Sequence, residues 1–287
     1  MNIQDIDALI RRALAEDAAD RDLTACATIA AGQAGRATII AKASGVVSGI
    51  AVAARVFALV DTEINSHWRC DDGDTVSAGD CMATLNGPLR SLLSAERTAL
   101  NFIQHLSGIA SATHAFVEAV AGTGCAIVDT RKTTPGLRHL EKQAVQHGGG
   151  LNHRMDLASG MLIKENHIVG AGSIAAAIGN CRALLSREGR ETDVWVEVEC
   201  ETLDEVREAV EAGPDIILLD NMNAQQTISA RALVPAEIVL ESSGNITLGN
   251  ARAYAGTGVD RLAIGAITHS APALDISMRV EATTTGA

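Results

Sequence analysis

The chain has 287 residues, of which 47% are hydrophobic and only six are aromatic (three Phe, two Trp and one Tyr). This length predicts one large domain or two of ordinary size, because a single hydrophobic core stops growing near ~250–300 residues. Asp and Glu outnumber Lys and Arg by 35 to 23, which gives a formal charge of −12. An acidic chain with so few aromatic rings is not expected to bind nucleic acid or anionic lipid.

The N-terminal segment contains acidic residues and lacks the continuous apolar stretch of a signal peptide. No apolar run in the sequence approaches the ~18 residues that a membrane span needs. The six cysteines are scattered, without the close pairs of a zinc knuckle or a redox motif, and we expect them to be small buried thiols. These observations predict a soluble, cytoplasmic protein with no membrane or nucleic-acid partner.

The first 108 residues mix helical and extended patterns without a regular order. Apolar residues at helical spacing predict an amphipathic helix from Ile3 to about Leu14 and one long helix from Leu89 to about Ser107. Between them, an alanine-rich helix is expected over 50–60, flanked by short apolar segments at 36–42 and 63–69. We therefore predict an α+β sandwich domain in this half of the chain.

From about residue 109 the pattern changes to alternating strands and helices. Nearly continuous apolar strands with helices between most of them are typical of a parallel sheet covered by helices. Most of these strands end in a polar or permissive residue, and the C-terminal strand ends of a barrel converge on one rim. We therefore predict an α/β fold with an incomplete TIM-like barrel over 109–269. An open Rossmann sheet is the alternative, but its G-x-G-x-x-G motif is missing after the first strand. The expected strands are 125–129, 160–164, 193–199, 215–220, 237–241 and 260–264.

Basic residues gather in one short window of this acidic chain. Three of the four lysines fall between Arg131 and His167, where six Lys and Arg stand against three acids and are joined by four histidines. A basic pocket in an acidic protein points to a small polyanionic ligand, because guanidinium groups match the geometry of carboxylates and phosphates. A solvated basic face is the alternative, but such a face would rarely lie at strand ends beside the glycine run 148–150.

Acidic residues mark two of the expected strands. Glu197 and Glu199 share one face of their strand by the period of two, and a carboxylate inside a barrel is costly unless a cation or a metal pairs with it. Glu199 and Asp220 lie at neighbouring strand ends and would suit Mg²⁺, which prefers one or two carboxylates plus waters and substrate oxygens. Salt bridges to Lys132 or Lys164 are the alternative, and the two interpretations are compatible.

Small residues form turns at the last two predicted strand ends, over 241–245 and 263–266. Backbone N–H groups at this place, with a helix N-terminus beyond them, are where barrels bind phosphate. Each turn alone is a weak signal, but the pair at this position predicts a phosphate site.

Seven stretches of the sequence closely resemble one enzyme family, quinolinate phosphoribosyltransferase, in the right order and across essentially the whole chain. They are SAERTALN at 94–101, DTRKTTPGLR at 129–138, GGGLNHR at 148–154, LIKENH at 162–167, VEVE at 196–199, LLDNM at 218–222 and GAITHS at 265–270. The resemblance implies an N-terminal α/β sandwich joined to an incomplete α/β barrel. It also implies that quinolinate and phosphoribosyl pyrophosphate give nicotinate mononucleotide, pyrophosphate and CO₂ in NAD biosynthesis, with Mg²⁺ as the cofactor.

The resemblance further implies an assembly of subunits. Members of the family are homodimers or larger assemblies of dimers, such as hexamers, in which the N-terminal domain of one subunit covers the barrel mouth of the other. Arg97 matches an arginine that is delivered from the neighbouring subunit. The C-terminal tail, residues 270–287 here, is expected to return to the N-terminal domain over 1–108.

Individual site residues follow from the resemblance, position by position. Those that match residues holding the two quinolinate carboxylates are Arg131, His153, Arg154 and Lys164. Those that match the catalytic, phosphoribosyl pyrophosphate and metal site are Lys132, Glu199 and Asp220, with Lys164 beside them. Those that match the loops for the 5′-phosphate are Ser243, Gly244, Asn245 and Gly265. Arg138, Asn166 and His167 lie in matching motifs without a clear role. Departures from the family pattern at Asp156, Ser159 and Asn245 concern loop geometry.

Elementary chemistry agrees with this assignment. Both substrates are polyanions, so the enzyme needs a locally cationic pocket whatever its overall charge. Carboxylates such as Glu199 and Asp220 could stabilise an oxocarbenium-like state at the sugar, while Mg²⁺ neutralises the departing pyrophosphate. Once the pyridine nitrogen is quaternary, the adjacent carboxylate can leave as CO₂ without a separate cofactor.

Three other functions are compatible with parts of the pattern. A relative that uses nicotinate without decarboxylation needs cations for one carboxylate only, whereas Arg97, Arg131, Arg154 and Lys164 supply more. A Schiff-base aldolase would use Lys164 with a lowered pKa at a barrel strand end. A ligand sensor that lost its chemistry is the non-enzymatic alternative, although each matched catalytic position holds a competent residue.

Overall fold

The computed structural model describes residues 3–282, which form two compact units. Within the described residues, the N-terminal unit contains 3–112, the segment 139–149 and 271–282. The barrel unit contains 113–138 and 150–270. The division expected from the sequence, at 108 and 269, did not include the inserted segment 139–149. The last residues of the expected tail, 283–287, lie outside the described part of the chain.

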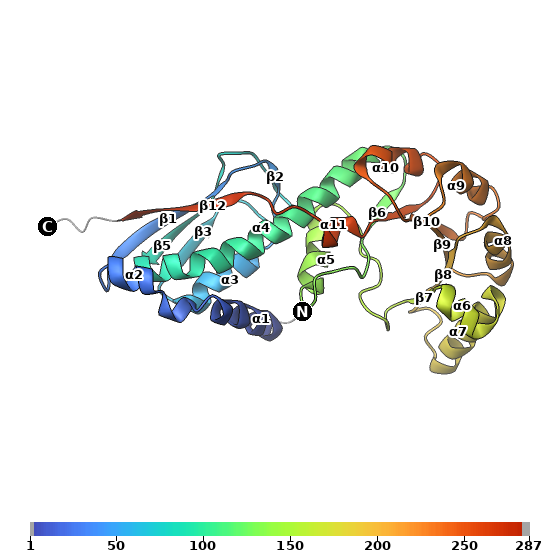
Figure 1. Cartoon of the computed structure of the whole chain (residues 1–287), viewed down its shortest axis with the longest axis horizontal. Coiled ribbons are helices and arrows are strands. Elements are labelled where there is room, and N and C mark those ends of the chain that lie inside the picture. The colour runs from blue at the N-terminus through green and yellow to red at the C-terminus, as the bar shows by residue number, and fades with distance from the viewer. Residues whose placement is uncertain (1–2, 283–287) are drawn as a thin grey trace. The chain divides into compact units, whose positions relative to one another are not determined.

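The N-terminal unit is built on an antiparallel sheet with helices against one face (Figure 1). The order of its strands is β12 (Ile276–Ala282), β1 (Ala34–Ala41), β5 (Cys81–Pro88) and β3 (Asn65–Trp68). Burial alternates along β1, because one face of the strand packs on the helices. The helices of this unit are α1 (Ile3–Glu16), the one-turn 3₁₀ helix η1 (Ala19–Arg21), α2 (Leu23–Thr28), α3 (Ile50–Val60), the first part of α4 (Leu89–Ala119) and most of α5 (Arg138–His147); β2 (Gly45–Val46) pairs with β4 (Thr75–Val76).

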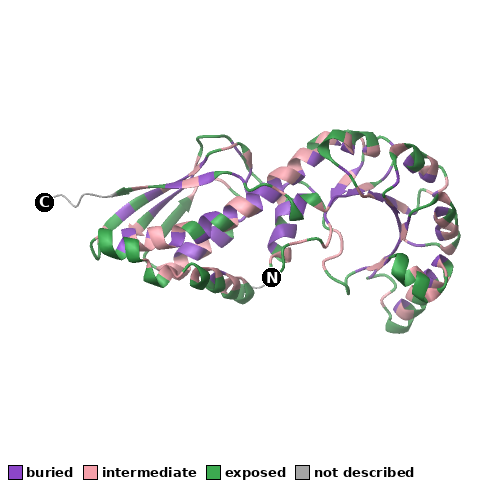
Figure 2. Ribbon diagram, in the orientation of Figure 1, coloured by how far each residue is buried: buried purple, intermediate pink, exposed green. Residues whose placement is uncertain are grey.

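The barrel unit holds a parallel sheet of six strands among the described residues, in the order β6-β11-β10-β9-β8-β7. Helices cover its outer face, and the strands themselves are mostly buried (Figure 2). Since β6 and β7 end the strand order without pairing with each other, the barrel is open. The strands are β6 (Ala126–Val128), β7 (Met161–Ile163), β8 (Val196–Cys200), β9 (Ile216–Asp220), β10 (Val239–Ser243) and β11 (Arg261–Ala263). The helices are α6 (Glu165–Ala171), α7 (Ile174–Glu188), α8 (Leu203–Ala212), α9 (Ala224–Arg231), α10 (Leu248–Ala255) and α11 (Ala266–His269).

The register of these strands places charged side chains in one row on the inner face. Leu218 of β9 pairs with Glu199 on one side and Glu241 on the other, and Glu241 pairs with Arg261 of β11. Paired residues on parallel neighbours point to the same face of a sheet. The expectation that Glu197 and Glu199 share a face is met by the strand geometry of β8.

The predicted α/β class and the six expected strands are confirmed. The long helix α4 continues to Ala119, well beyond the expected end near Ser107. Patterning missed α5, β5 and β12, which pack through contacts remote in sequence. The prediction that all cysteines are buried was wrong, because Cys26 is exposed at the surface. Within residues 3–282 no single helix is long and apolar enough to cross a bilayer; α6 and α7, bent by 87°, meet that length and composition only as a pair.

Candidate active site

A pocket of about 580 Å³ opens in the barrel unit at the C-terminal ends of its strands. Four of the cations predicted from the sequence line it, together with both acids of the predicted metal pair. Its lining comprises Thr130, Arg131, Lys132, His153, Arg154, Leu162, Lys164, Glu199, Leu218, Asp220, Asn221, Glu241, Ser243, Gly244, Asn245 and Ala263. Strand ends from every part of the sheet therefore converge on one cavity, as the barrel hypothesis requires.

Two arginines in the pocket repel each other. The pKa of Arg154 is lowered, first because the guanidinium is buried and second because Arg131 is close. The Nε of Arg131 is buried and has no hydrogen-bond partner in the described chain. A buried guanidinium donor without an acceptor is costly, and two like charges side by side add to that cost. Both costs disappear when an anion with several oxygens occupies the pocket.

Hydrogen bonds to neighbouring loops hold the side chains of Arg138 and Arg154. Arg138 donates to Thr133 Oγ1 at 3.0 Å and to the carbonyl oxygen of Met155 at 3.2 Å, which ties together the loops that follow β6 and precede β7. Arg154 itself donates to the carbonyl oxygen of Gly160 at 3.1 Å. Arg138 therefore positions the loops and is not among the residues lining the pocket.

The acidic side of the pocket is partly neutralised by a lysine. Lys164, just after β7, forms an ion pair with Glu199 at the end of β8, so the predicted salt bridge is present. The ring of His167 accepts the backbone N–H of Lys164 at 2.9 Å and so fixes the start of α6. Asp220, at the end of β9, accepts a hydrogen bond from the side chain of Asn221 at 2.7 Å. Glu199 and Asp220 thus face one cavity with oxygen ligands for a cation.

The first residue after β10 is a glycine that no other residue could replace without moving the turn. Gly244 has φ +90°, and a Cβ there would lie 2.1 Å from Oδ1 of Asn221. Asn245 also has a positive φ, 55°, and its side chain donates to the same Asn221 oxygen at 3.1 Å. Asparagine tolerates this backbone region better than most residues, which explains how Asn245 can occupy it. The turn brings backbone amides of 243–245 to the rim of the pocket.

Gly265 lies beside the pocket, at the start of α11, and is not part of its described lining. A Cβ at Gly265 would come within 3.1 Å of the Lys132 side chain, so this glycine leaves room for the lysine. Thr268 fixes the same segment by donating to the carbonyl oxygen of Lys132 at 2.8 Å. Gly244, in the turn after β10, therefore leaves room for Asn221, and Gly265, in the turn after β11, leaves room for Lys132.

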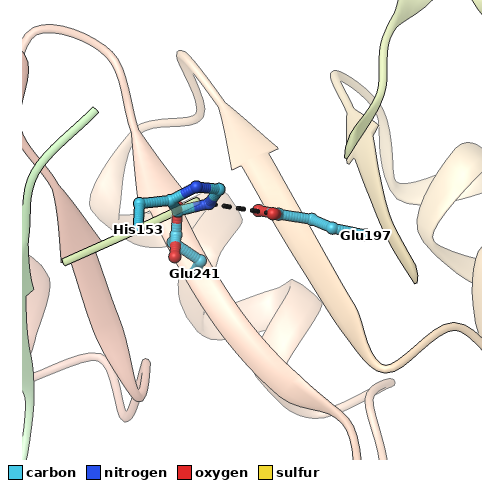
Figure 3. A group of neighbouring side chains, drawn as sticks. All are labelled: His153, Glu197 and Glu241. Carbon is cyan, nitrogen blue, oxygen red and sulfur yellow. Dashed lines mark ion pairs between the residues drawn. The ribbon is translucent and has the colours of Figure 1, made fainter. Parts of the chain in front are cut away.

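Two residues of the pocket lining, His153 and Glu241, form a cluster with the buried Glu197 (Figure 3). His153 Nε2 lies 2.9 Å from Glu197 Oε2 and 3.6 Å from Glu241 Oε1, and both glutamate side chains have no exposed surface. The indole of Trp195 packs edge-on against the imidazole with 5.1 Å between ring centres. Burial raises the pKa of both glutamates to about 8. His153, predicted to hold a substrate carboxylate, is 6% exposed and turns Nε2 toward these acids.

Part of the basic window does not contribute to this pocket. Lys142 and Glu141 are buried in α5, in the segment that belongs to the N-terminal unit, and Glu141 pairs with His105 at 2.8 Å. His147 of the same segment bonds Ser48 at 2.8 Å. The basic window is therefore divided between two units, because α5 interrupts the barrel sequence. Arg97 is an exposed residue of α4 in the N-terminal unit.

Sequence reasoning did not select Asn221 or Glu241 as site residues, although both line the pocket. Asn221 directly follows the selected Asp220 at the end of β9, and Glu241 lies within β10, two residues before the selected Ser243. Two of the departures from the family pattern, Asp156 and Ser159, lie in an exposed turn, where Ser159 Oγ accepts the N–H groups of Met155 and Asp156 at 2.9 and 3.1 Å. Asp156 accepts the N–H of Ala158 at 2.9 Å, and this bond lowers the pKa of its carboxyl. The turn satisfies its own polar groups.

Comparisons with known proteins bear on both units. Residues 22–107 match the N-terminal domain of quinolinate phosphoribosyl transferase, and residues 109–279 match its C-terminal domain. The chain belongs to this family. It is 43% identical over 280 residues to a probable nicotinate-nucleotide pyrophosphorylase [carboxylating] of Bacillus subtilis, covering 98% of this chain and 95% of that protein. It is 42% identical over 276 residues to a nicotinate-nucleotide pyrophosphorylase [carboxylating] of Mycobacterium leprae, with 94% and 95% covered.

Solved structures of the family have the same fold. The crystal structure of NadC from Streptococcus pyogenes matches with a TM-score of 0.92 at 40% identity, covering 98% of each chain. A nicotinate-nucleotide pyrophosphorylase from Francisella tularensis matches with a TM-score of 0.92 at 39% identity, again over 98% of each chain. The predicted N-terminal sheet domain followed by an incomplete α/β barrel is therefore confirmed as the fold of this chain.

Proposed function

We propose that this protein transfers the phosphoribosyl group of phosphoribosyl pyrophosphate to the nitrogen of quinolinate and releases pyrophosphate, CO₂ and nicotinate mononucleotide. The observation that carries this proposal is the pair Arg131 and Arg154, two mutually repelling guanidinium groups in one pocket, one with a buried donor that has no acceptor among residues 3–282. Quinolinate is a planar dicarboxylate, and its four oxygens would supply the missing acceptors. Lys164, which also lines the pocket, adds a third cation.

The remaining lining residues of the pocket suit the donor sugar. The amides of the turn at Ser243, Gly244 and Asn245 would receive the 5′-phosphate, and Lys132 with Gly265 behind it would face the pyrophosphate. Glu199 and Asp220 offer hard oxygen ligands in the same cavity and so fit Mg²⁺, which would be bound by these two carboxylates and the donor's oxygens. When bound, Mg²⁺ would offset the charge of the leaving pyrophosphate.

The residues of the chain then have defined tasks in the reaction. Arg131 and Arg154 orient the pyridine ring so that its nitrogen faces the anomeric carbon. Glu199 and Asp220 stabilise the positive charge that develops on the sugar as pyrophosphate leaves. The new bond makes the nitrogen cationic, and the carboxylate at the adjacent carbon can leave as CO₂ because the electron pair that remains is next to that charge.

The first test is an incubation with quinolinate, phosphoribosyl pyrophosphate and Mg²⁺, in which CO₂ and nicotinate mononucleotide are followed by mass spectrometry. Nicotinate is the parallel substrate. We expect product from quinolinate and none from nicotinate. Product from nicotinate alone would contradict the two-carboxylate assignment, and trapping of Lys164 by borohydride with an aldehyde would support the aldolase instead.

We also propose that the protein works as a homodimer, or as a hexamer of such dimers, in which Arg97 completes the site of the neighbouring subunit. The support is the exposure of Arg97 on α4 and its match to the family motif. Arg97→Ala and Glu199→Ala are each expected to be inactive, and mixing them should restore part of the activity, since some dimers would contain one intact site. No recovery despite demonstrated subunit exchange would contradict a shared site. A cytoplasmic location stays a prediction from the sequence.

A further inference from the structure

Asn221 joins two parts of the pocket that have separate tasks in the proposed reaction. It directly follows β9, and its side-chain N–H donates to Asp220 Oδ2 at 2.7 Å. Its Oδ1 accepts an N–H from the side chain of Asn245 at 3.1 Å. Asp220 is one of the two carboxylates that fit Mg²⁺, and Asn245 belongs to the turn that would receive the 5′-phosphate. A single amide therefore connects the metal carboxylate to the phosphate turn.

The backbone holds both asparagines in a conformation that few residues adopt. Asn221 and Asn245 each have φ 55°, and they are the two residues other than glycine with a positive φ in the described part of the barrel unit. The N–H of Asn221 donates to the carbonyl oxygen of Ser243 at 2.9 Å, and Gly244 lacks the Cβ that would lie 2.1 Å from Asn221 Oδ1. Backbone strain of this kind persists only where the surroundings fix it. The contact between the two side chains is thus built into the turn.

The groups at the two ends fix the direction of these hydrogen bonds. An ionised carboxylate only accepts, so Asn221 presents its N–H to Asp220 and its oxygen to Asn245. A reversed amide would place its oxygen against the carboxylate and its N–H groups against those of Asn245. At the far end, the backbone oxygen of Asn245 accepts the side-chain N–H of Asn250 in α10 at 3.0 Å. The link between helix, turn and carboxylate is therefore made in one orientation only.

Such a link affects binding at both of its ends. A hydrogen bond to one oxygen of a metal-binding carboxylate orients that group, and loss of the partner typically lowers metal affinity by about 10–100-fold. The same amide restrains the turn whose backbone N–H groups would meet the phosphate. A ligand that fixes one end should therefore favour binding at the other, and coupling between two sites is reciprocal. A residue that only supported the turn would weaken binding without making one ligand depend on the other.

We propose that Asn221 and Asn245 are positioning residues that make binding of the 5′-phosphate and binding of Mg²⁺ depend on each other. This inference rests on the proposed function, which supplies the two ligands. Asn221 acts through the Asp220 carboxylate, and Asn245 acts through Asn221. Asn245 is one of the positions at which the chain departs from the family pattern, so the complete link is a feature of this chain that the resemblance does not imply.

The test measures binding to the full-length protein by calorimetry. The probe is ribose 5-phosphate, which carries the phosphate without the pyrophosphate, titrated with saturating Mg²⁺ and again with a chelator. In the wild-type protein we expect Mg²⁺ to lower the Kd of the probe about 10-fold. Asn245→Gly removes the link while glycine adopts φ 55° freely, so this ratio should fall to about 2 or less. Asn221→Gly should lower it equally, and the double variant no further, because all three lack the same link. Asn65→Ala, which removes an exposed amide from the N-terminal unit, is the control and should keep the wild-type ratio.

Failure of the link and failure of the proposed function give different results. An unchanged ratio in the two glycine variants would overturn the proposal, because Mg²⁺ and the probe would then influence each other without the link. That holds also if both variants bind the probe more weakly by the same factor with and without Mg²⁺, since the asparagines would then only support the turn. A wild-type protein that binds no ribose 5-phosphate under either condition would show that the donor site, and with it the proposed function, had been assigned wrongly. In turnover assays, the Michaelis constant for phosphoribosyl pyrophosphate should rise more at limiting than at saturating Mg²⁺ in Asn245→Gly.

Discussion

The two sheets of this chain use their inner faces differently. In the N-terminal unit, the buried positions of β1 are Gly35, Ala37, Ile39 and Ala41, which pack against helices with no charge to satisfy. In the barrel unit, the corresponding face carries glutamates on β8 and β10, two of which have no exposed surface. Apolar packing stabilises a fold, whereas buried carboxylates cost free energy. The difference indicates which sheet is a support and which one carries the chemistry.

The largest loss of turnover is expected from substitutions of charged residues at the C-terminal ends of the barrel strands. Lys132→Ala and Glu199→Ala should each lower turnover by about 10³-fold, because each removes a charge that acts on the reacting groups, with little change in thermal stability. Initial rates and melting curves measured side by side would check this. Lys42→Ala is the matched control, since Lys42 is an exposed lysine of the N-terminal unit. Near-wild-type turnover in either variant would remove that residue from the catalytic assignment.

The opposite result is expected in the N-terminal sheet. Ile39 is fully buried in the middle of β1, so Ile39→Ala should lower the free energy of unfolding by about 3 kcal/mol through lost burial and a residual cavity. Thr38→Ala, at the next position on the other face of the strand, should cost less than about 1 kcal/mol. Denaturant titrations would measure both. Equal costs at the two positions would contradict the alternation on which the comparison of the sheets depends.

A smaller effect, on binding of the donor, is expected from a change in backbone geometry at the rim of the pocket that alters no charge. Gly244→Ala places a methyl group where Asn221 Oδ1 lies 2.1 Å away, so the turn must move, and the Michaelis constant for phosphoribosyl pyrophosphate should rise about 10-fold. Gly172→Ala is the control, because Gly172 also has a positive φ, 96°, but no atom within 4 Å of the added carbon. It should lower stability and leave the Michaelis constant unchanged. If both variants bind the donor alike, the close approach to Asn221 has no role in binding.

Sequence patterns predicted the parts of this molecule that depend on local periodicity. The alternation of β8 placed Glu197 and Glu199 on one face, and strand ends pointed to Asp220 and Lys164. The limits appear where distant segments meet. The pairing of β1 with β12 joins Gly35 to Ala282, and nothing local to either strand encodes it.

The same limit applies to the site. The steric need for glycine at 244 arises from Asn221 on another strand, and the burial of Lys142 follows from the place of α5 in the N-terminal unit. A count of basic residues along the chain could not separate Lys142 from Lys132, because both lie in one window of sequence. Only the fold assigns one to a core and the other to a pocket.

The smallest effect concerns how stability depends on pH. A carboxyl with a raised pKa binds its proton more tightly in the folded protein, so its contribution is full below the unfolded value near 4.5 and is lost as the pH rises through the folded value of about 8. Glu241→Gln needs no proton, so between pH 6.5 and 7.5 this variant should lose about 1 kcal/mol less stability than the wild-type protein. Glu63→Gln, which removes an exposed carboxylate from the N-terminal unit, is the control. Denaturant titrations at the two pH values would give the change in stability for each variant. An equal change for Glu241→Gln and for the control would mean that Glu241 is ionised in the folded protein. The inner face of the barrel sheet would then carry its full negative charge at neutral pH.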